Sequence, residues 1–320
     1  MVMSAAVPAT DLFSKRLIFV LGKGGVGRTT MSAALGLLLA RRGKRVLLFQ
    51  SSTKERLGAL FGKPVGEEVT FIRENLWAVN TNPQAALHEY GLMVLKWETV
   101  YKMVFENRFA KALVRAIPGV DDYAVLGKAW FHTTEMQGDR PRFDTVVFDG
   151  PATGHSITML RIPTAILTAV PEGPLTRDAA RARDLLTDRE RTAAVLVTLA
   201  EEMPANETVE LVARLRKEIG MHPSHLIINA LYPERFKDGS APGRVLTALL
   251  GAGGAADDPE LAPLLGRGRI ARARRKLNDT YLARLVQDVP LPTAKVPSLF
   301  VPILGPREVE AIADTLEKQL

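Results

Sequence analysis

The sequence predicts an α/β protein of three layers, in which helices cover both faces of a mostly parallel sheet. Short apolar runs alternate with stretches of helical pattern along most of the 320 residues, as they do when crossover helices join parallel strands. Most of these runs are continuous and β-branched, which is typical of strands buried on both faces. The runs lie at 17–21, 46–49, 77–79, 145–148, 195–199, 226–228 and 299–303.

Long helical stretches interrupt the alternation. Residues at about 82–140 and 156–190 predict a helical subdomain inserted at the ligand edge of the sheet, within a single domain spanning 1–320. Apolar side chains at 92–109 occupy more than one helix face. They favour packing inside the subdomain, but a groove for a hydrophobic client helix stays open as an alternative. We expect residues 1–14 to be a flexible N-terminus.

Composition narrows the function classes. The chain has no cysteine, which excludes disulfides and thiolate metal sites and suits a cytoplasmic protein. We see no signal peptide and no apolar run long enough to form a transmembrane segment. The net charge of +7 is compatible with an anionic partner. The densest basic stretch, 267–276, spreads its cations around a helix without aromatic residues between them, so DNA binding is open but not favoured.

A glycine-rich segment follows the first apolar run and precedes an Ala/Leu-rich helical stretch. Glycines at such a junction let backbone N–H groups surround phosphate oxygens, and the helix N-terminus adds partial positive charge. The segment fits a phosphate-binding loop except that Arg28 stands where the pattern has lysine. We expect Thr29 to hold Mg²⁺ and Thr30 to reach another phosphate oxygen. The predicted loop residues are Gly22, Lys23, Gly24, Gly25, Val26, Gly27, Arg28, Thr29 and Thr30.

A second acidic element completes the predicted site. The run at 143–149 reads as a strand that ends in Asp149. In phosphate-loop enzymes such an aspartate commonly holds Mg²⁺ or its water shell. The alternative is an aspartate that caps the next helix. With the glycine loop upstream, the pattern favours the metal role for Asp149 and predicts a P-loop NTPase fold.

Two motifs together resemble one family. Lys23 stands directly before Gly-Gly-x-Gly, and Asp149 is followed by Thr153, Gly154 and His155. The chain therefore resembles the ArsA and tail-anchored-protein targeting ATPases, which belong to the deviant P-loop class that includes ParA and MinD. Weaker similarities lie at 118–122, 201–208, 227–229 and 301–304.

The resemblance implies ATP or ADP with Mg²⁺ as ligands and a nucleotide-dependent dimer. It implies that Lys23 crosses the dimer interface to the nucleotide of the other subunit. It also implies that Asn229 and Pro302 lie near the adenine base. Family members that bind arsenite or zinc use cysteines for it, so neither site is expected here.

Two departures from the family pattern concern catalysis. Arg28 replaces the lysine of the phosphate loop, and a planar guanidinium is larger than the compact ammonium group. In the segment after the second strand, anchoring on Leu57 and Phe61 places Ser52 where the family has the aspartate that positions the attacking water. A serine cannot act as a carboxylate base, and Glu55 is a nearby alternative. We count Lys23, Arg28 and the degenerate Ser52 position as the catalytic set.

The sequence thus predicts an ATP-binding subunit with weak or absent hydrolysis of its own, acting as a homodimer or as a heterodimer with an intact paralogue. Two alternatives stay open. One is a slow homodimeric targeting or chaperone ATPase for hydrophobic helices, and the other is a ParA/MinD-like positioning ATPase on DNA. The acidic helix expected at 308–320 does not resemble a basic amphipathic membrane anchor.

Overall fold

A computed structural model gives the structure of residues 11–52, 55–86, 120–169, 171–252 and 258–320. An eight-stranded sheet runs through it in the order β10-β9-β8-β1-β7-β2-β4-β3, and only β3 is antiparallel to its neighbour. The strands are β1 (Leu17–Leu21), β2 (Val46–Ser51), β3 (Thr70–Arg73), β4 (Leu76–Thr81), β7 (Thr145–Asp149), β8 (Thr192–Leu199), β9 (Pro223–Leu231) and β10 (Thr293–Pro297); β5 (Met136–Gln137) and β6 (Arg140–Pro141) form a separate hairpin.

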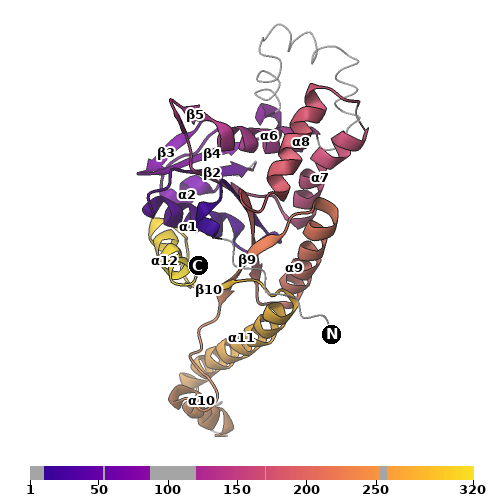
Figure 1. Cartoon of the computed structure of the whole chain (residues 1–320). Coiled ribbons are helices and arrows are strands. Elements are labelled where there is room, and N and C mark those ends of the chain that lie inside the picture. The colour runs from indigo at the N-terminus through magenta and orange to yellow at the C-terminus, as the bar shows by residue number, and fades with distance from the viewer. Residues whose placement is uncertain (1–10, 53–54, 87–119, 170, 253–257) are drawn as a thin grey trace.

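Helices cover both faces of the sheet, which confirms the predicted three-layer α/β/α architecture (Figure 1). One face carries α1 (Arg28–Arg41) and α12 (Pro306–Glu317), together with the short α2 (Leu57–Phe61). The other face carries α6 (Val120–Thr134), α7 (Thr153–Ala169), α8 (Pro174–Thr187) and α9 (Glu202–Arg214), which continues into a π-helical turn at Leu215–Ile219.

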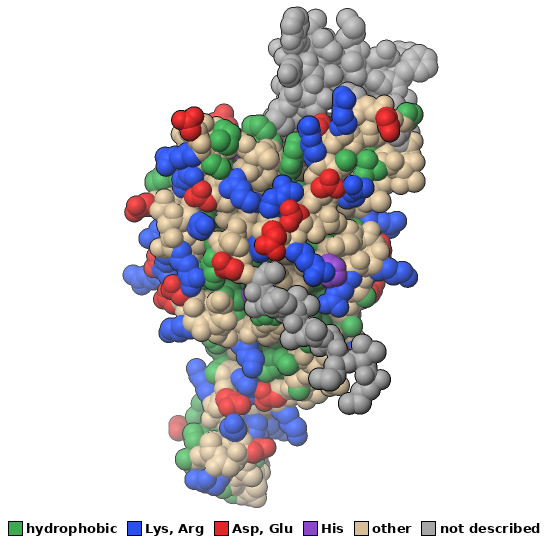
Figure 2. Space-filling model, viewed as in Figure 1, with side chains coloured by type: hydrophobic (Ala, Val, Ile, Leu, Met, Phe, Trp, Pro, Cys, Tyr) green, Lys and Arg blue, Asp and Glu red, His purple; other side chains and the backbone are tan. Residues whose placement is uncertain are grey.

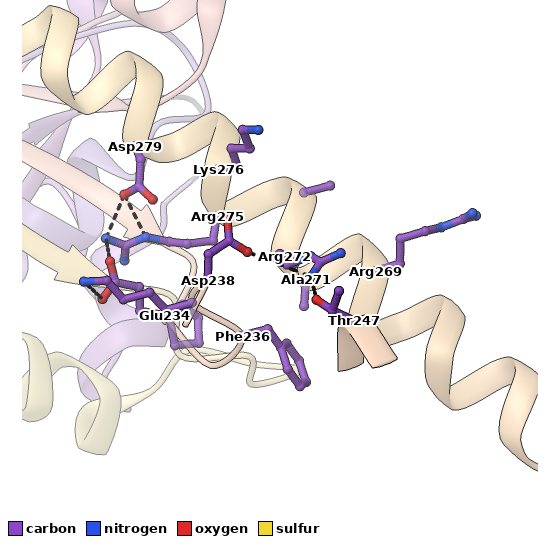
Figure 3. A pocket seen from close by; sticks show the side chains of 13 residues that line it. Glu234, Phe236, Asp238, Thr247, Arg269, Ala271, Arg272, Arg275, Lys276 and Asp279 are labelled. Atoms are coloured by element: carbon purple, nitrogen blue, oxygen red, sulfur yellow. Dashed lines mark hydrogen bonds and ion pairs between the residues drawn. The ribbon is translucent and has the colours of Figure 1, made fainter. Parts of the chain in front are cut away.

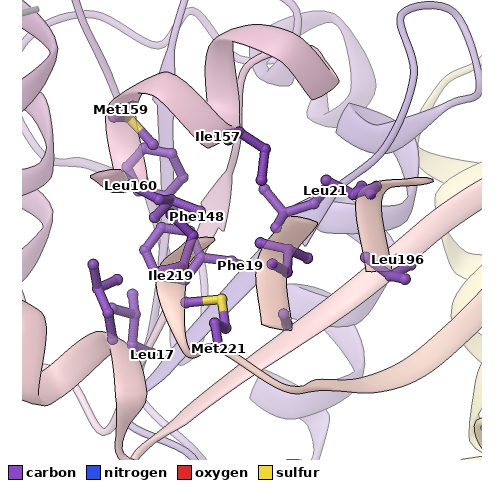
Figure 4. Packing of buried hydrophobic residues seen from close by; sticks show 14 of the residues in the cluster. Leu17, Phe19, Leu21, Phe148, Ile157, Met159, Leu160, Leu196, Ile219 and Met221 are labelled. Carbon is purple, nitrogen blue, oxygen red and sulfur yellow. The ribbon is translucent and has the colours of Figure 1, made fainter. Parts of the chain in front are cut away.

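The strands that carry the glycine loop and Asp149 are buried at every position. Figure 4 shows Phe19 of β1 and Phe148 of β7 side by side beneath Ile157 and Leu160 of α7. The ring centroids of Phe19 and Phe148 are 5.0 Å apart, a separation at which aromatic rings attract one another. Continuous apolar strands therefore hold the two halves of the predicted site in fixed register.

Six of the seven predicted strands are present, and the prediction of a strand at 299–303 is wrong. The edge strand is β10, which pairs Thr293 with Leu226 of β9 and ends at Pro297. Beyond it Phe300 adopts a positive φ of 50°, which an extended strand does not allow. Pro302 consequently lies in an exposed loop that leads into α12.

Helices α10 (Ala241–Gly251) and α11 (Leu261–Asp288) form an arm that projects away from the sheet (Figure 1). The C-terminal part of α11 packs on the sheet through the buried Leu285, and the N-terminal part runs beside α10. None of the helices described is both long enough and apolar enough to cross a membrane.

The predicted helical subdomain and the predicted flexible N-terminus are described only in part by the structure. Helices α6, α7 and α8 share a small apolar cluster that includes Tyr123, Ile162 and Ala179. The stretch at 92–109 lies outside the described residues. Residues 12–14, which the sequence assigned to a flexible N-terminus, form a short 3₁₀ helix with Leu12 buried.

Candidate nucleotide site

The glycine loop has a backbone that only glycine allows at three positions. Gly22, Gly25 and Gly27 have φ values of 156°, 87° and 95°. A Cβ atom on Gly22 would lie 2.2 Å from the carbonyl oxygen of Val197, and one on Gly27 would lie 2.3 Å from Nδ2 of Asn229. Helix α1 begins directly after Gly27 without a side-chain cap, so its first N–H groups face the loop. This is the geometry of an anion-binding loop at a helix N-terminus.

Asp149 lies beneath the loop and accepts three side-chain hydrogen bonds. Its donors are Thr29 Oγ1 at 2.7 Å, Gln50 Nε2 at 2.8 Å and Ser32 Oγ at 3.4 Å. The carboxylate is almost fully buried. Burial raises the pKa of Asp149 above its usual range, against the opposing hydrogen bonds of Thr29 and Gln50 and the charge of Arg28. A buried carboxylate beside a hydroxyl oxygen is a donor set that suits Mg²⁺ completed by phosphate and water oxygens.

Arg28 does not occupy the loop as a lysine would. Its guanidinium donates to the carbonyl oxygen of Gly150, the residue after β7. Burial lowers the pKa of Arg28; the carboxylate of Asp149 opposes this shift and the cation of Arg56 adds to it. The Arg28 side chain therefore links the phosphate loop to the segment after β7, and its guanidinium is hydrogen-bonded to a backbone carbonyl there.

The segment after β2 places Ser52 at the end of the strand. The backbone N–H of Ser52 donates to Oδ1 of Asn80 at 3.1 Å, and the carbonyl of Ser52 accepts from Nδ2 of Asn80 at 3.0 Å. Ser52, Asp122 and His155 line one cavity of about 130 Å³, and His155 Nε2 lies 3.0 Å from Asp122 Oδ1. The structure thus brings together three segments that the sequence treated separately.

Glu55, the alternative to Ser52, is engaged elsewhere. Its Oε1 accepts from the backbone N–H of Gly58 at 2.6 Å, within the first turn of α2. A carboxylate that caps a helix in this way is stabilised by the exposed N–H groups. It is directed to α2 and not into the phosphate loop.

Lys23 is held within its own chain. Its Nζ lies 2.6 Å from Oε1 of Glu207 and 2.6 Å from Sδ of Met203, both on α9. Asn229, at the end of β9, donates through Nδ2 to the carbonyl of Val26 at 2.9 Å. The first contact joins the loop to α9, and the second joins it to β9, where the resemblance placed the base.

The phosphate side of the loop opens into a cavity of about 310 Å³. Its lining includes Gly25, Thr29 and Thr30 from the loop, Arg56 from the segment after β2, and Leu304 from the loop before α12. The sequence motifs do not single out Arg56, Ser32 or Gln50. Gln50 could have been found from strand order, because it pairs with Asp149 across neighbouring strands.

The basic stretch at 267–276 borders a larger cavity, of about 690 Å³, between α11 and the connection from β9 to α10. Figure 3 shows Arg275 directed at Asp279 and Glu234, and Arg272 at Thr247. Arg269 points away from these pairs (Figure 3). Over one face of the molecule, basic and acidic side chains are interspersed (Figure 2). The pairing of these cations favours a solvated helix over a surface built for DNA.

Comparison with known proteins agrees with this geometry. The profile of the anion-transporting ATPase family, ArsA, matches residues 15–172 and 175–245. The chain is 30% identical over 243 residues to an arsenical pump-driving ATPase of Acidiphilium multivorum, covering 68% of this chain and 40% of that protein. It is 26% identical over 262 residues to the ATPase GET3 of Kluyveromyces lactis, covering 71% of this chain and 75% of that protein.

The chain thus spans about two fifths of the length of the arsenical pump-driving ATPase that it matches. The matched residues include the glycine loop, Asp149 and Asn229, which are the positions that build the site described above. This chain belongs to the ArsA family of anion-transporting ATPases.

Proposed function

We propose that this chain is a nucleotide-binding subunit that holds ATP or ADP with Mg²⁺ and hydrolyses ATP weakly or not at all on its own. The observation that carries the proposal is the pairing of Thr29 with the buried Asp149 beneath a loop that only glycines can form. Loop N–H groups and Thr30 would hold the phosphates. Thr29 and Asp149 would hold Mg²⁺, which neutralises phosphate charge when bound. Asn229 and Pro302 would lie on the side of the base.

Weak hydrolysis follows from two positions. Phosphoryl transfer depends on a positioned water and on cations that stabilise charge developing in the transition state. Ser52 has no carboxylate to orient that water, and Glu55 is used as a helix cap. The guanidinium of Arg28 donates to Gly150, so it is not free to follow the phosphate charge.

We further propose that the chain acts as a dimer, either with itself or with an ArsA-like paralogue whose site is intact. Lys23 would then leave Glu207 and reach the nucleotide of the partner. This ion pair is partly exposed, so breaking it costs little, about 0–1 kcal/mol. With no cysteine in the chain, a thiolate site for arsenite or zinc is excluded. We expect the protein to work in the cytoplasm.

Titration calorimetry with ADP and a non-hydrolysable ATP analogue, with and without Mg²⁺, tests the binding proposal. We expect Mg²⁺-dependent binding with a Kd that the Thr29→Val variant weakens at least tenfold. Turnover of the purified chain alone should be far below that of the chain purified with its paralogue. No binding at millimolar nucleotide, by the chain or by its natural complex, would overturn the proposal.

A further inference from the structure

Arg56 has no assigned role in this family resemblance, yet it lies at the phosphate loop. It is the residue directly before α2, and it lines the same cavity of about 310 Å³ as Gly25, Thr29 and Thr30. Its side chain is exposed, and no carboxylate in the described part of the chain pairs with it. Arg56 is therefore an exposed cation that lines an open space beside the predicted phosphates.

The cavity has an excess of positive charge. Arg28 lines it as well, and the charge of Arg56 is felt at Arg28. Among the described residues that line the cavity, none carries a carboxylate. Two guanidinium groups that share a cavity repel each other unless an anion lies between them, and phosphate oxygens match guanidinium geometry. Asp149 offsets part of the charge of Arg28 but does not line the cavity. The charge of Arg56 therefore has no counterpart among the described lining residues, and an oligophosphate would supply one.

The backbone of Arg56 is linked through Gln50 to Asp149, the carboxylate proposed to hold Mg²⁺. Its N–H donates to Oε1 of Gln50 at 3.4 Å, and Nε2 of the same Gln50 donates to Asp149 at 2.8 Å. Glu55, its neighbour, is turned toward Gly58 and caps α2. The carboxylate of this segment is thus engaged at α2, while Arg56 lines the cavity beside the loop.

We propose that Arg56 binds the phosphate chain of the nucleotide in this chain's own site, as a second cation that compensates for the engagement of Arg28 with Gly150. The inference rests on the proposed function in that the anion expected there is a nucleotide. Its chemistry is that of any oligophosphate, so inorganic tripolyphosphate is a second, independent probe.

The experiment compares the full chain with Arg56→Gln, Arg56→Lys and the control Arg177→Gln, which removes one exposed cation from α8. Binding of tripolyphosphate and of a non-hydrolysable ATP analogue is measured by calorimetry at two salt concentrations. Loss of one charged hydrogen-bonding contact should weaken both ligands roughly tenfold to a hundredfold in Arg56→Gln. Arg56→Lys should recover part of the loss, and Arg177→Gln should bind as the parent does.

Four outcomes separate the two proposals. Weakening of both ligands by Arg56→Gln supports both. Nucleotide binding that stays within twofold in Arg56→Gln overturns the role of Arg56 and leaves the proposed function intact. Arg56-dependent binding of tripolyphosphate without binding of the ATP analogue supports the phosphate role and overturns the proposed function. A parent chain that binds neither ligand overturns both. Equal melting temperatures of the four proteins show that folding is unchanged.

Discussion

Lys23 and Glu207 form an ion pair within a single chain, with Nζ and Oε1 2.6 Å apart, although they lie 184 positions apart in sequence. Met203, one helical turn earlier on α9, contacts the same ammonium group through its sulfur. The cation that distinguishes this phosphate loop is thus already satisfied in cis. Any role for Lys23 at a partner's nucleotide requires this pair to open.

Glu207→Gln should therefore favour the dimer. The variant releases Lys23 at a cost in folding free energy of about 0–1 kcal/mol, because the pair is partly exposed. We expect tighter nucleotide-dependent association by roughly twofold to fivefold, measured by analytical ultracentrifugation with an ATP analogue.

Lys23→Ala should remove the contribution of this chain to the nucleotide site of its partner. In a mixed dimer with a wild-type partner, it should leave this subunit's own nucleotide binding unchanged and slow single-turnover hydrolysis in the partner about a hundredfold. An unchanged partner rate would contradict the action of Lys23 in trans.

Restoring the family residues should raise hydrolysis. Arg28→Lys places a compact ammonium group in the loop, and Ser52→Asp supplies a carboxylate at the end of β2. We expect the double variant to hydrolyse ATP at least ten times faster than the parent chain, since both elements act in the transition state. Phosphate release in single-turnover and steady-state assays measures this.

Glu55→Gln is the matched control for that experiment. Its carboxylate caps α2, so the variant should leave turnover unchanged and lower only the melting temperature. Parent turnover equal to that of intact relatives would contradict weak hydrolysis by this chain. Loss of turnover in Glu55→Gln would show that the water is positioned by Glu55 and not from position 52.

The core of this fold was predictable because its central strands are buried on both faces. Continuous runs such as 17–21 and 145–148 show no alternation and were found from that property alone. The edge strands β3 and β10 were not predicted because they are not buried on both faces. In β10 buried and exposed side chains alternate around the exposed Lys295, whereas the apolar run at 299–303 is a loop with exposed Val301 and Ile303.

The site was predictable where it depends on local sequence and not where it depends on packing. The glycine loop and Asp149 belong to motifs in which a few residues determine the backbone. Gln50 reaches Asp149 only because β2 and β7 are neighbours in the sheet. The pair of Lys23 with Glu207 and the place of Arg56 beside Thr30 likewise depend on tertiary contacts, which no spacing in one sequence reveals.

His225 should make the protein sensitive to acid. It lies buried in β9, and burial lowers the pKa of its imidazole below the usual value of about 6.5. The unfolded state therefore binds the proton more readily, and stability falls as the pH drops below about 6.5. His225→Phe should reduce this slope by up to about 1.4 kcal/mol per pH unit, measured by urea unfolding between pH 7.5 and 5. Parallel curves for the two proteins would contradict the prediction.

Asp149→Asn should stabilise the protein without nucleotide and abolish its response to Mg²⁺. Burial raises the pKa of Asp149, so the folded state holds the proton more readily than the unfolded state. The stability contributed by the protonated form is present at low pH and is lost as the pH rises through the folded pKa. At pH 7 the buried carboxylate is a cost, and the variant should gain free energy of unfolding.

Asp144 directly precedes β7 and provides a control variant for which the expected change in stability has the opposite sign. Burial alone would raise its pKa, but hydrogen bonds from Arg45 hold the pKa of Asp144 below its usual range. Asp144→Asn should therefore destabilise the protein at pH 7, and the loss should shrink as the pH falls through the pKa of the folded carboxyl group. Urea unfolding from about pH 2 to 8 should give curves that approach the parent at low pH, from above for Asp149→Asn and, only below the usual aspartate pKa of about 3.9, from below for Asp144→Asn. Only the parent and Asp144→Asn should gain stability from Mg²⁺ with ADP. An Asp149→Asn variant that loses stability at pH 7, or still gains it from Mg²⁺ with ADP, would show that this carboxylate serves the fold and not the metal.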